Sequence, residues 1–199
     1  MTAPFAYPAT PHVRRHGPQG YADYAGFRPW LRDEFTFRCV YCLLREQWAR
    51  HGSFGIDHFL AVAHHAAQAT DYDNLLFACA PCNAAKQDRL LPDPLRVLTN
   101  AAVQVAADGT IRTDDAEAAQ LIELLGLNSD KSTEFRMLWI GIIALAAKHE
   151  PELYAKLMGF PADLPNLSRL RPPKGNARPE GVPQSWHARR EAGTLPETY

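Results

Sequence analysis

The residues best suited to chemistry are concentrated in residues 37–90. A carboxylate and an imidazole are adjacent at Asp57 and His58, and amide side chains follow at Asn74 and Asn83. Histidine has an ordinary pKa of about 6.5, so it can accept a proton from water near neutral pH. One carboxylate and one amide oxygen are enough for Mg²⁺, which prefers oxygen ligands and keeps several waters. These residue types favour hydrolysis assisted by a hard cation.

All four cysteines lie in the same stretch, as two C-x-x-C pairs formed by Cys39 with Cys42 and Cys79 with Cys82. Two intervening residues allow a tight turn to aim both thiolates at one tetrahedral metal, and two pairs complete a structural zinc site with no open position. The pairs are 36 residues apart, whereas the usual gap is about 15–20. An additional segment is therefore inserted between the two C-x-x-C turns, which we call the first and second knuckle.

Two alternatives to zinc are four reduced cysteines packed as small apolar groups and two disulfides. Residues 1–15 lack the apolar region of a secretory signal peptide. We therefore expect a reducing cytoplasmic location, which favours zinc over disulfides.

The elements that must position these residues can be predicted locally. Residues 53–62 are apolar and aromatic enough for a strand, with the Asp-His pair at its middle. Pro81 suits the first turn of a helix that continues to Gln87. Asn83 and Lys86 are three residues apart and share one face of that helix. Strand, hairpin and helix around one metal would make a ββα unit.

One geometric difficulty accompanies this prediction. Adjacent residues of a strand point to opposite faces. Asp57 and His58 can therefore serve one phosphate only if the strand bulges or ends there.

The order of these motifs resembles the HNH endonucleases, and more narrowly their bacterial four-cysteine branch. The resemblance covers about a quarter of the chain, with four elements in the right order. Those elements are Cys39-x-x-Cys42, Ile56-Asp57-His58, Asp73-Asn74-Leu75-Leu76 and Cys79-x-x-Cys82-Asn83-x-x-Lys86.

The resemblance implies an α+β fold with a ββα-metal, treble-clef-like core that hydrolyses DNA phosphodiesters with one divalent ion, Mg²⁺ or Mn²⁺. It implies that His58 is the general base and that Asp57 and Asn83 are ligands of the catalytic ion. It also implies that Asn74 braces the loop carrying the base.

We expect two cations near the end of the helix, Lys86 and Arg89, to contact substrate phosphates. The chain departs from the family where Asn83 replaces a histidine, a variation that occurs in the family. It departs again at residues 60–65, where two histidines stand in place of a Pro-Lys-Ser type loop. His64 and His65 are either contacts to DNA or metal, or ordinary loop residues.

Charge does not by itself favour nucleic-acid binding, since the net charge is −1. Residues 1–50 hold seven basic against four acidic residues, whereas residues 101–150 hold four against eight. The nuclease half is the more plausible DNA face. The alternative function is a non-catalytic zinc module that binds DNA or protein, and the sequence leaves RNA open as a substrate.

The rest of the chain suggests smaller units. Residues 1–20 are predicted to form an irregular basic arm, which either lies along a phosphate backbone or is a loose terminus. Residues 21–92 are predicted to form the nuclease core. Residues 93–169 read as a hairpin turning at Asp108-Gly109, followed by helices from Thr113 and from Ser132 and a third from Pro151. Residues 170–199 read as a disordered tail rich in proline.

The helix predicted from Ser132 to His149 is apolar through residues 137–147. That run is too short for a membrane span of roughly 20 residues, so we interpret the helix as buried or, alternatively, as an oligomer interface. The C-terminal helices are therefore where a homodimer or another protein partner would bind. The hairpin and helices also resemble, more weakly, the module that succeeds the core in some bacterial defence nucleases.

Overall fold

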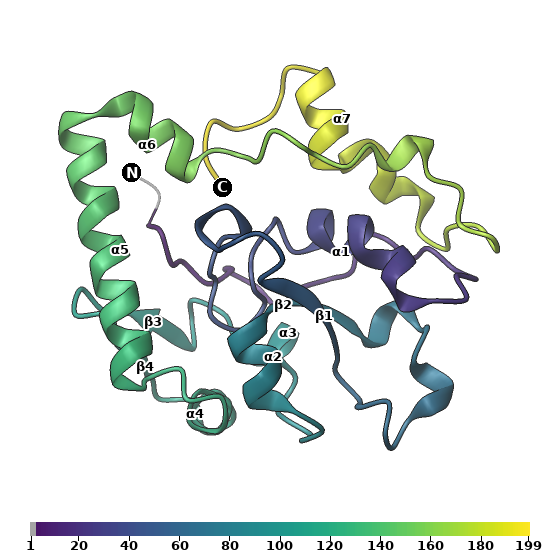
Figure 1. Cartoon of the computed structure of the whole chain (residues 1–199), viewed down its shortest axis with the longest axis horizontal. Coiled ribbons are helices and arrows are strands. Elements are labelled where there is room, and N and C mark those ends of the chain that lie inside the picture. The colour runs from purple at the N-terminus through teal and green to yellow at the C-terminus, as the bar shows by residue number, and fades with distance from the viewer. Residues whose placement is uncertain (1–2) are drawn as a thin grey trace.

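The computed structural model describes residues 3–199, and a small ββα unit lies at its centre (Figure 1). Strands β1 (Phe54–His58) and β2 (Leu75–Cys79) pair antiparallel, and helix α2 (Ala80–Lys86) follows β2 directly. Phe54 lies opposite Cys79, and His58 lies opposite Leu75. The predicted α+β fold with a ββα core is confirmed.

Strand β2 is buried at every position because both of its faces are covered. Helix α1 (Arg28–Glu34) contacts β2, and α2 contacts both strands. Proline at the second position of α2 suits the first turn, whose N–H groups need no helical partner. Gln87 ends α2 with a positive φ of 55°. This arrangement packs the helix start against the hairpin.

The predicted strand was too long at its C-terminal end. Strand β1 stops at His58, and residues 59–73 form a loop that contains two short 3₁₀ helices, η3 (Ala66–Gln68) and η4 (Tyr72–Asn74). Beyond His58 the backbone no longer pairs with the partner strand. Instead, the Asn74 side chain forms hydrogen bonds with both the N–H and the carbonyl of Leu60.

The predicted hairpin and helices are present. The hairpin consists of β3 (Val103–Val105) and β4 (Ile111–Thr113), and a short helix, α3 (Pro94–Val97), precedes it. Helices α4 (Ala116–Leu124), α5 (Asp130–His149) and α6 (Pro151–Met158) follow. Asp115 rather than Thr113 caps α4, since its carboxylate accepts from the Ala118 N–H. The guanidinium of the buried Arg136 fastens α5 to the hairpin through the Gly109 carbonyl at 2.6 Å.

Helix α5 is not buried all round, so the interpretation as a buried helix was wrong for one of its faces. Ile143 and Ala146 are buried, but Leu138 and Leu145 expose 55% and 64% of their surface. The helix lies at one edge of the molecule, where only its inner face meets the rest of the chain (Figure 1).

The basic N-terminal segment is irregular, as predicted, but it is neither loose nor extended into solvent. Phe5 and Tyr7 are part of the main hydrophobic core, and His16 is completely buried. The Tyr7 hydroxyl donates to the carbonyl of Tyr41, 2.9 Å away. Residues 3–20 therefore pack on the core that contains the central ββα unit.

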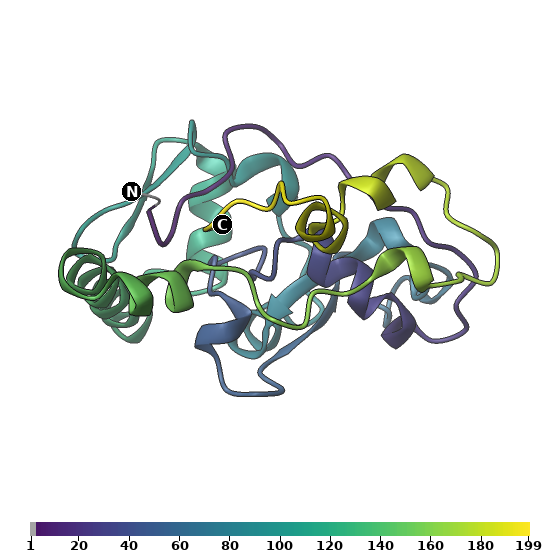
Figure 2. The ribbon, with the colours of Figure 1, turned by 90° about the horizontal axis from the view of Figure 1, so that it is seen from above.

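The prediction of a disordered tail was also wrong. Residues 170–199 contain η6 (Pro179–Gln184) and α7 (Trp186–Glu191), and they run beside α1 and the N-terminal segment (Figures 1 and 2). The Trp186 ring N–H and backbone N–H both donate to Asp33, and Arg178 binds the Asp73 carboxylate with both guanidinium arms. These anchors lie far away in the sequence, so composition alone does not reveal them.

The remaining short 3₁₀ helices are η1 (Tyr24–Phe27), η2 (Glu46–Trp48) and η5 (Leu167–Arg169). Residues 3–199 include no helix that is both long enough and apolar enough to cross a membrane.

Candidate active site and metal centre

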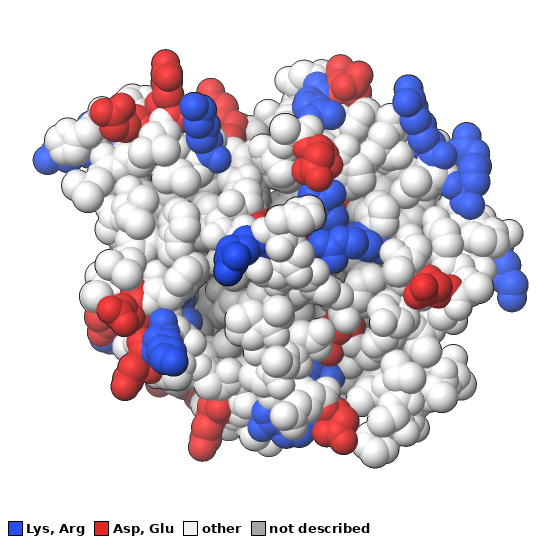
Figure 3. Space-filling model, in the orientation of Figure 1, with Lys and Arg blue, Asp and Glu red and all other residues white. Residues whose placement is uncertain are grey.

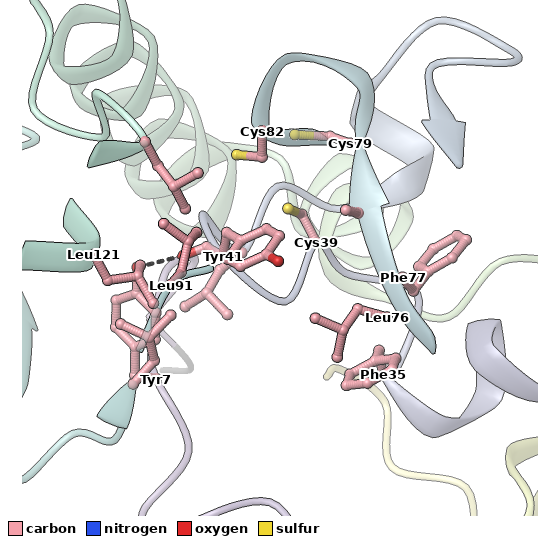
Figure 4. Packing of buried hydrophobic residues seen from close by; sticks show 14 of the residues in the cluster. Tyr7, Phe35, Cys39, Tyr41, Leu76, Phe77, Cys79, Cys82, Leu91 and Leu121 are labelled. Carbon is pink, nitrogen blue, oxygen red and sulfur yellow. Dashed lines mark hydrogen bonds between the residues drawn. The ribbon is translucent and has the colours of Figure 1, made fainter. Parts of the chain in front are cut away.

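The four cysteines form one cluster, with all four sulfur atoms within 4.8 Å of one another. A tetrahedral zinc with Zn–S bonds of about 2.3 Å requires sulfur atoms about 3.8 Å apart. The Cys42 and Cys79 sulfurs are 3.6 Å apart. Figure 4 shows Cys39, Cys79 and Cys82 gathered at the start of α2. The set matches a closed four-thiolate zinc site.

Local backbone geometry presents these thiols. In the first knuckle the Leu43 N–H donates to the Cys39 carbonyl, and Leu43 adopts a positive φ of 59°. The Val40 N–H donates to the Phe77 carbonyl at 3.0 Å, which ties this knuckle to β2. In the second knuckle Cys79 ends β2 and caps α2. A metal here would hold the first knuckle against the start of α2.

The electrostatics of the cluster suit a cation. Burial opposes ionisation of Cys39, but hydrogen bonds from the other three thiols lower its pKa well below the usual range. Contacts with Cys39 and Cys79 and burial raise the pKa of Cys42, and contacts with the other three thiols and burial raise the pKa of Cys82. A divalent ion would stabilise the thiolate form of all four cysteines.

Asp57 is almost completely buried on the face of the hairpin that α2 covers. The Tyr41 hydroxyl donates to its Oδ2 at 2.5 Å, and the Lys86 ammonium lies 3.3 Å from its Oδ1. Burial raises the pKa of Asp57, while the hydrogen bond from Tyr41 and the charge of Lys86 oppose that rise. Both carboxylate oxygens thus have protein partners.

The expectation that Lys86 contacts substrate phosphates is contradicted, because its side chain is completely buried. Its ammonium donates to the His58 carbonyl at 2.7 Å and pairs with Asp57. The shared helix face of Lys86 and Asn83 points toward the hairpin rather than toward solvent. Arg89 is exposed, and its guanidinium donates to the Lys86 and Ala85 carbonyls at the end of α2.

His58 extends from the opposite face of β1 and is half-buried. Its Nε2 lies 3.0 Å from the Ala69 carbonyl oxygen. A carbonyl can only accept, so this nitrogen carries the hydrogen and Nδ1 retains the basic lone pair. The Tyr24 ring packs edge-on against the imidazole, with centroids 4.9 Å apart. Sequence reasoning missed Tyr24, since nothing in its local pattern points to the strand about 30 residues later.

The strand ends at His58 without a bulge, since the pairing of Asp57 with Leu76 and of His58 with Leu75 is regular. The side chains of Asp57 and His58 consequently contact different neighbours. The carboxylate lies among Tyr41 and α2, and the imidazole lies against η1 and the loop. The two groups are still close enough to be coupled, because a positive charge on His58 would lower the Asp57 pKa.

Asn74 is buried and connects both ends of the loop after β1. Its Oδ1 accepts from the Leu60 N–H at 2.7 Å, and its Nδ2 donates to the carbonyls of Leu60 and Gln68. Gln68 directly precedes Ala69, the partner of the His58 imidazole. These hydrogen bonds hold the two ends of the loop together.

Asn83 lies on the Asp57 side of the hairpin. Its Nδ2 is 3.8 Å from the position that a β-carbon would take at Gly55, and Gly55 shares a face with Asp57. One carboxylate and one amide are therefore on the same side, and their chemistry suits a hard divalent ion. Such an ion would share Asp57 with the Lys86 ammonium.

The two loop histidines are exposed, and His64 lies 3.5 Å from the Asp88 carboxylate. Within residues 3–199, the cysteine cluster is the one group of three or more His, Cys, Asp or Glu side chains that could hold a metal. His64 and His65 thus have the surroundings of ordinary loop residues.

Comparison with known families agrees with this geometry. The model of the HNH endonuclease family matches residues 39–89, from the first cysteine of the cluster to Arg89. No curated protein matches the chain. The matched segment contains all four cysteines, both strands of the central hairpin and α2. Residues 39–89 of this chain are therefore similar to the HNH endonuclease family across the whole central ββα unit.

Proposed function

We propose that the protein is a metal-dependent endonuclease that hydrolyses DNA phosphodiester bonds, with His58 as its general base. The observation that carries this proposal is the contact between His58 Nε2 and the Ala69 carbonyl, which leaves Nδ1 as the basic nitrogen. The HNH match supports nucleic acid as the substrate class.

In this mechanism Nδ1 of His58 accepts a proton from the attacking water as its oxygen bonds to phosphorus. The bond from phosphorus to the leaving oxygen breaks, and that oxygen is protonated from solvent. The imidazolium that forms keeps its Nε2–H on the Ala69 carbonyl, which favours its positive charge. Tyr24 limits rotation of the ring, and Asn74 holds the loop that carries Ala69.

Asp57 and Asn83 would hold the catalytic Mg²⁺ or Mn²⁺, which would neutralise charge on the phosphate and on the leaving oxygen. The chain's own contribution is to hold the carboxylate in place. Tyr41 and Lys86 fix both of its oxygens from the protein side. Arg89, three residues beyond the end of α2, remains the exposed cation that we assign to phosphate contact.

One observation favours a second candidate, a non-catalytic zinc module that binds DNA or protein. Asp57 is 3% exposed, and Lys86 already supplies a positive charge beside it. A buried and neutralised carboxylate is a weaker ligand for an added ion. In this alternative, the Asp57–Lys86 pair serves only to join β1 to α2.

A cleavage assay with His58→Ala separates the two candidates. Supercoiled plasmid and a single-stranded RNA are incubated with the protein and Mg²⁺, Mn²⁺ or EDTA. We expect metal-dependent cleavage of DNA by the wild-type protein and a loss of about 10²–10⁴-fold in His58→Ala, because the proton acceptor is gone. His64→Ala, in the exposed part of the same loop, is the matched control and should cleave normally.

Cleavage by His58→Ala at the wild-type rate would exclude the proposed mechanism. Zinc content and DNA binding of the variant are measured in parallel, so that unfolding is not mistaken for loss of the base. Binding without cleavage by the wild-type protein under every metal condition would favour the zinc module. Preferential cleavage of the RNA would reassign the substrate.

A further inference from the structure

Exposed apolar side chains are concentrated on two consecutive helices. Ten large apolar residues are exposed within residues 3–199, and six of them lie on α5 and α6. Apolar residues scattered singly over a surface are normal, but a contiguous group marks a contact site. The six are Phe135, Met137, Leu138, Ile142, Leu145 and Leu153, exposed by 40–64%.

On α5 the outer face follows a regular line. Glu134, Leu138, Gly141, Leu145 and Lys148 are spaced alternately by four and three residues. That spacing keeps side chains on one narrow stripe of a helix, as in the seam between two paired helices. All five residues are exposed, whereas Arg136, Ile143 and Ala146 on the other side are buried.

The centre of this stripe is open. A β-carbon at Gly141 would meet no atom within 4 Å. Leu138 and Leu145 stand on either side of this glycine, so a second helix could approach the backbone closely between them. Figure 3 shows the surface over α5 as largely uncharged between charged groups at its two ends.

The charges at the two ends are complementary under a two-fold rotation. Glu134 precedes Gly141 by seven residues and Lys148 follows it by seven. Neither side chain takes part in an ion pair within residues 3–199. Two antiparallel copies crossing at Gly141 would place each Glu134 against Lys148 of the other copy. A parallel pair would place like charges together instead.

We propose that α5 is a homodimer interface, in which two copies of this chain pair antiparallel about Gly141. Leu138 and Leu145 form the apolar centre, and the Glu134 and Lys148 side chains form ion pairs at both ends. The same surface patch serves both copies, as a closed two-fold dimer requires. Phe135, Met137, Ile142 and Leu153 widen the contact toward the roughly 800 Å² per partner of a stable interface.

This interface leaves the nuclease site accessible. Helix α5 lies at the opposite edge of the molecule from the loop that follows β1 (Figures 1 and 2). The dimer therefore does not depend on whether the HNH domain is catalytic.

The test is sedimentation of the purified full chain over a micromolar concentration range. We expect a wild-type dimer, and a monomer for Leu145→Asp, because a charge cannot be buried unpaired at the centre. Leu145 is largely exposed in the single chain, so this variant should keep its zinc content and helical circular dichroism. Leu90→Asp, at an exposed leucine beyond α2, is the matched control and should remain dimeric.

Charge exchange tests the antiparallel arrangement. Glu134→Lys and Lys148→Glu should each raise the dimer dissociation constant about 10-fold, because each creates two like-charge pairs. The double variant should return to the wild-type dimer dissociation constant, because both ion pairs between positions 134 and 148 are restored with their charges exchanged. Glu123→Lys, at an exposed site on α4, should have no effect.

A wild-type chain that stays monomeric would overturn the proposal, and it would point instead to a different protein as the occupant of this face. A dimer that Leu145→Asp leaves intact would overturn it as well. A double variant no tighter than the singles would overturn the antiparallel register about Gly141.

Discussion

At the level of single residues, neighbours in the sequence have opposite environments. Asp57 is buried and contacts a phenol and an ammonium, whereas His58 is half-buried and keeps one ring nitrogen available. The regular pairing of β1 separates them, because consecutive residues face opposite sides. Lys86 bridges both, through the Asp57 carboxylate and the His58 carbonyl.

The first prediction concerns Lys86. Lys86→Met should lower the free energy of unfolding by about 3–5 kcal/mol, because it leaves the buried Asp57 carboxylate without its cation. Urea unfolding measures this change. The double variant with Asp57→Asn should recover part of the loss, since the uncompensated charge is then removed.

A matched control is Lys174→Met, which removes an exposed lysine outside α5 and outside the ββα unit. Its stability should change by less than about 0.5 kcal/mol. If Lys86→Met were as stable as this control, Lys86 would not serve as the buried counter-ion that its contacts indicate.

At the level of structural elements, the four-cysteine cluster joins three pieces of the chain. The first knuckle, the end of β2 and the first turn of α2 meet at the four cysteines. The binding free energy of a structural zinc is part of the folding free energy. A zinc bound by the four cysteines would therefore help to hold Asn83 beside Gly55.

The second prediction is the consequence of losing that metal. Cys79→Ser should abolish tight zinc binding and unfold the HNH core, with loss of the near-ultraviolet circular dichroism. Elemental analysis should find one zinc per wild-type chain and less in the variant. Soluble wild-type protein without zinc, or a variant as stable as the wild type, would contradict the assignment.

The third prediction concerns the C-terminal segment as an element. Trp186 bonds Asp33 twice and packs on the Phe160 ring, 4.8 Å between centroids. Trp186→Ala should release residues 170–199 from α1, so trypsin should cleave after Arg178 much faster. Trp139→Ala, in the remote α5, should leave that rate unchanged. Equal cleavage of wild type and Trp186→Ala would mean that the segment is held by other contacts.

At the level of the whole molecule, two buried carboxylates at the end of α1 bring the N-terminal and C-terminal segments together. Asp33 contacts His16 and Trp186. Glu34 contacts His12, accepts from the Arg15 and His16 N–H groups, and accepts from the Tyr72 hydroxyl. Burial opposes ionisation, yet the hydrogen bonds and the charge of His12 lower the pKa of Glu34 to about 2.

The fourth prediction is the pH dependence that results. A carboxyl group with a depressed pKa in the folded state stabilises the fold above its unfolded pKa of about 4.3. That stability is lost as the pH falls from there through about 2. The loss should be on the order of 3 kcal/mol, measured by urea unfolding across this range. Glu34→Gln should flatten the curve, whereas Glu123→Gln, exposed on α4, should leave its slope unchanged.

Local sequence was enough to specify the central unit. The cysteine spacing, the Asp-His pair and the Asn-Leu pair predicted the four-cysteine cluster, the hairpin and α2, because each depends on neighbours within one short stretch. The brace by Asn74 was predictable for the same reason, since its partners lie within 14 residues.

Which surfaces are buried depended instead on tertiary packing. Whether Lys86 faces solvent or Asp57 depends on how α2 lies on the hairpin, which helical spacing does not specify. The packing of residues 170–199 depends on contacts with Asp33 and Asp73, more than 100 residues away in the sequence. The proline-rich composition of this segment does not indicate such distant contacts. The apolar run in α5 indicated burial, but a helix at the edge of a fold buries only the face that meets its neighbours.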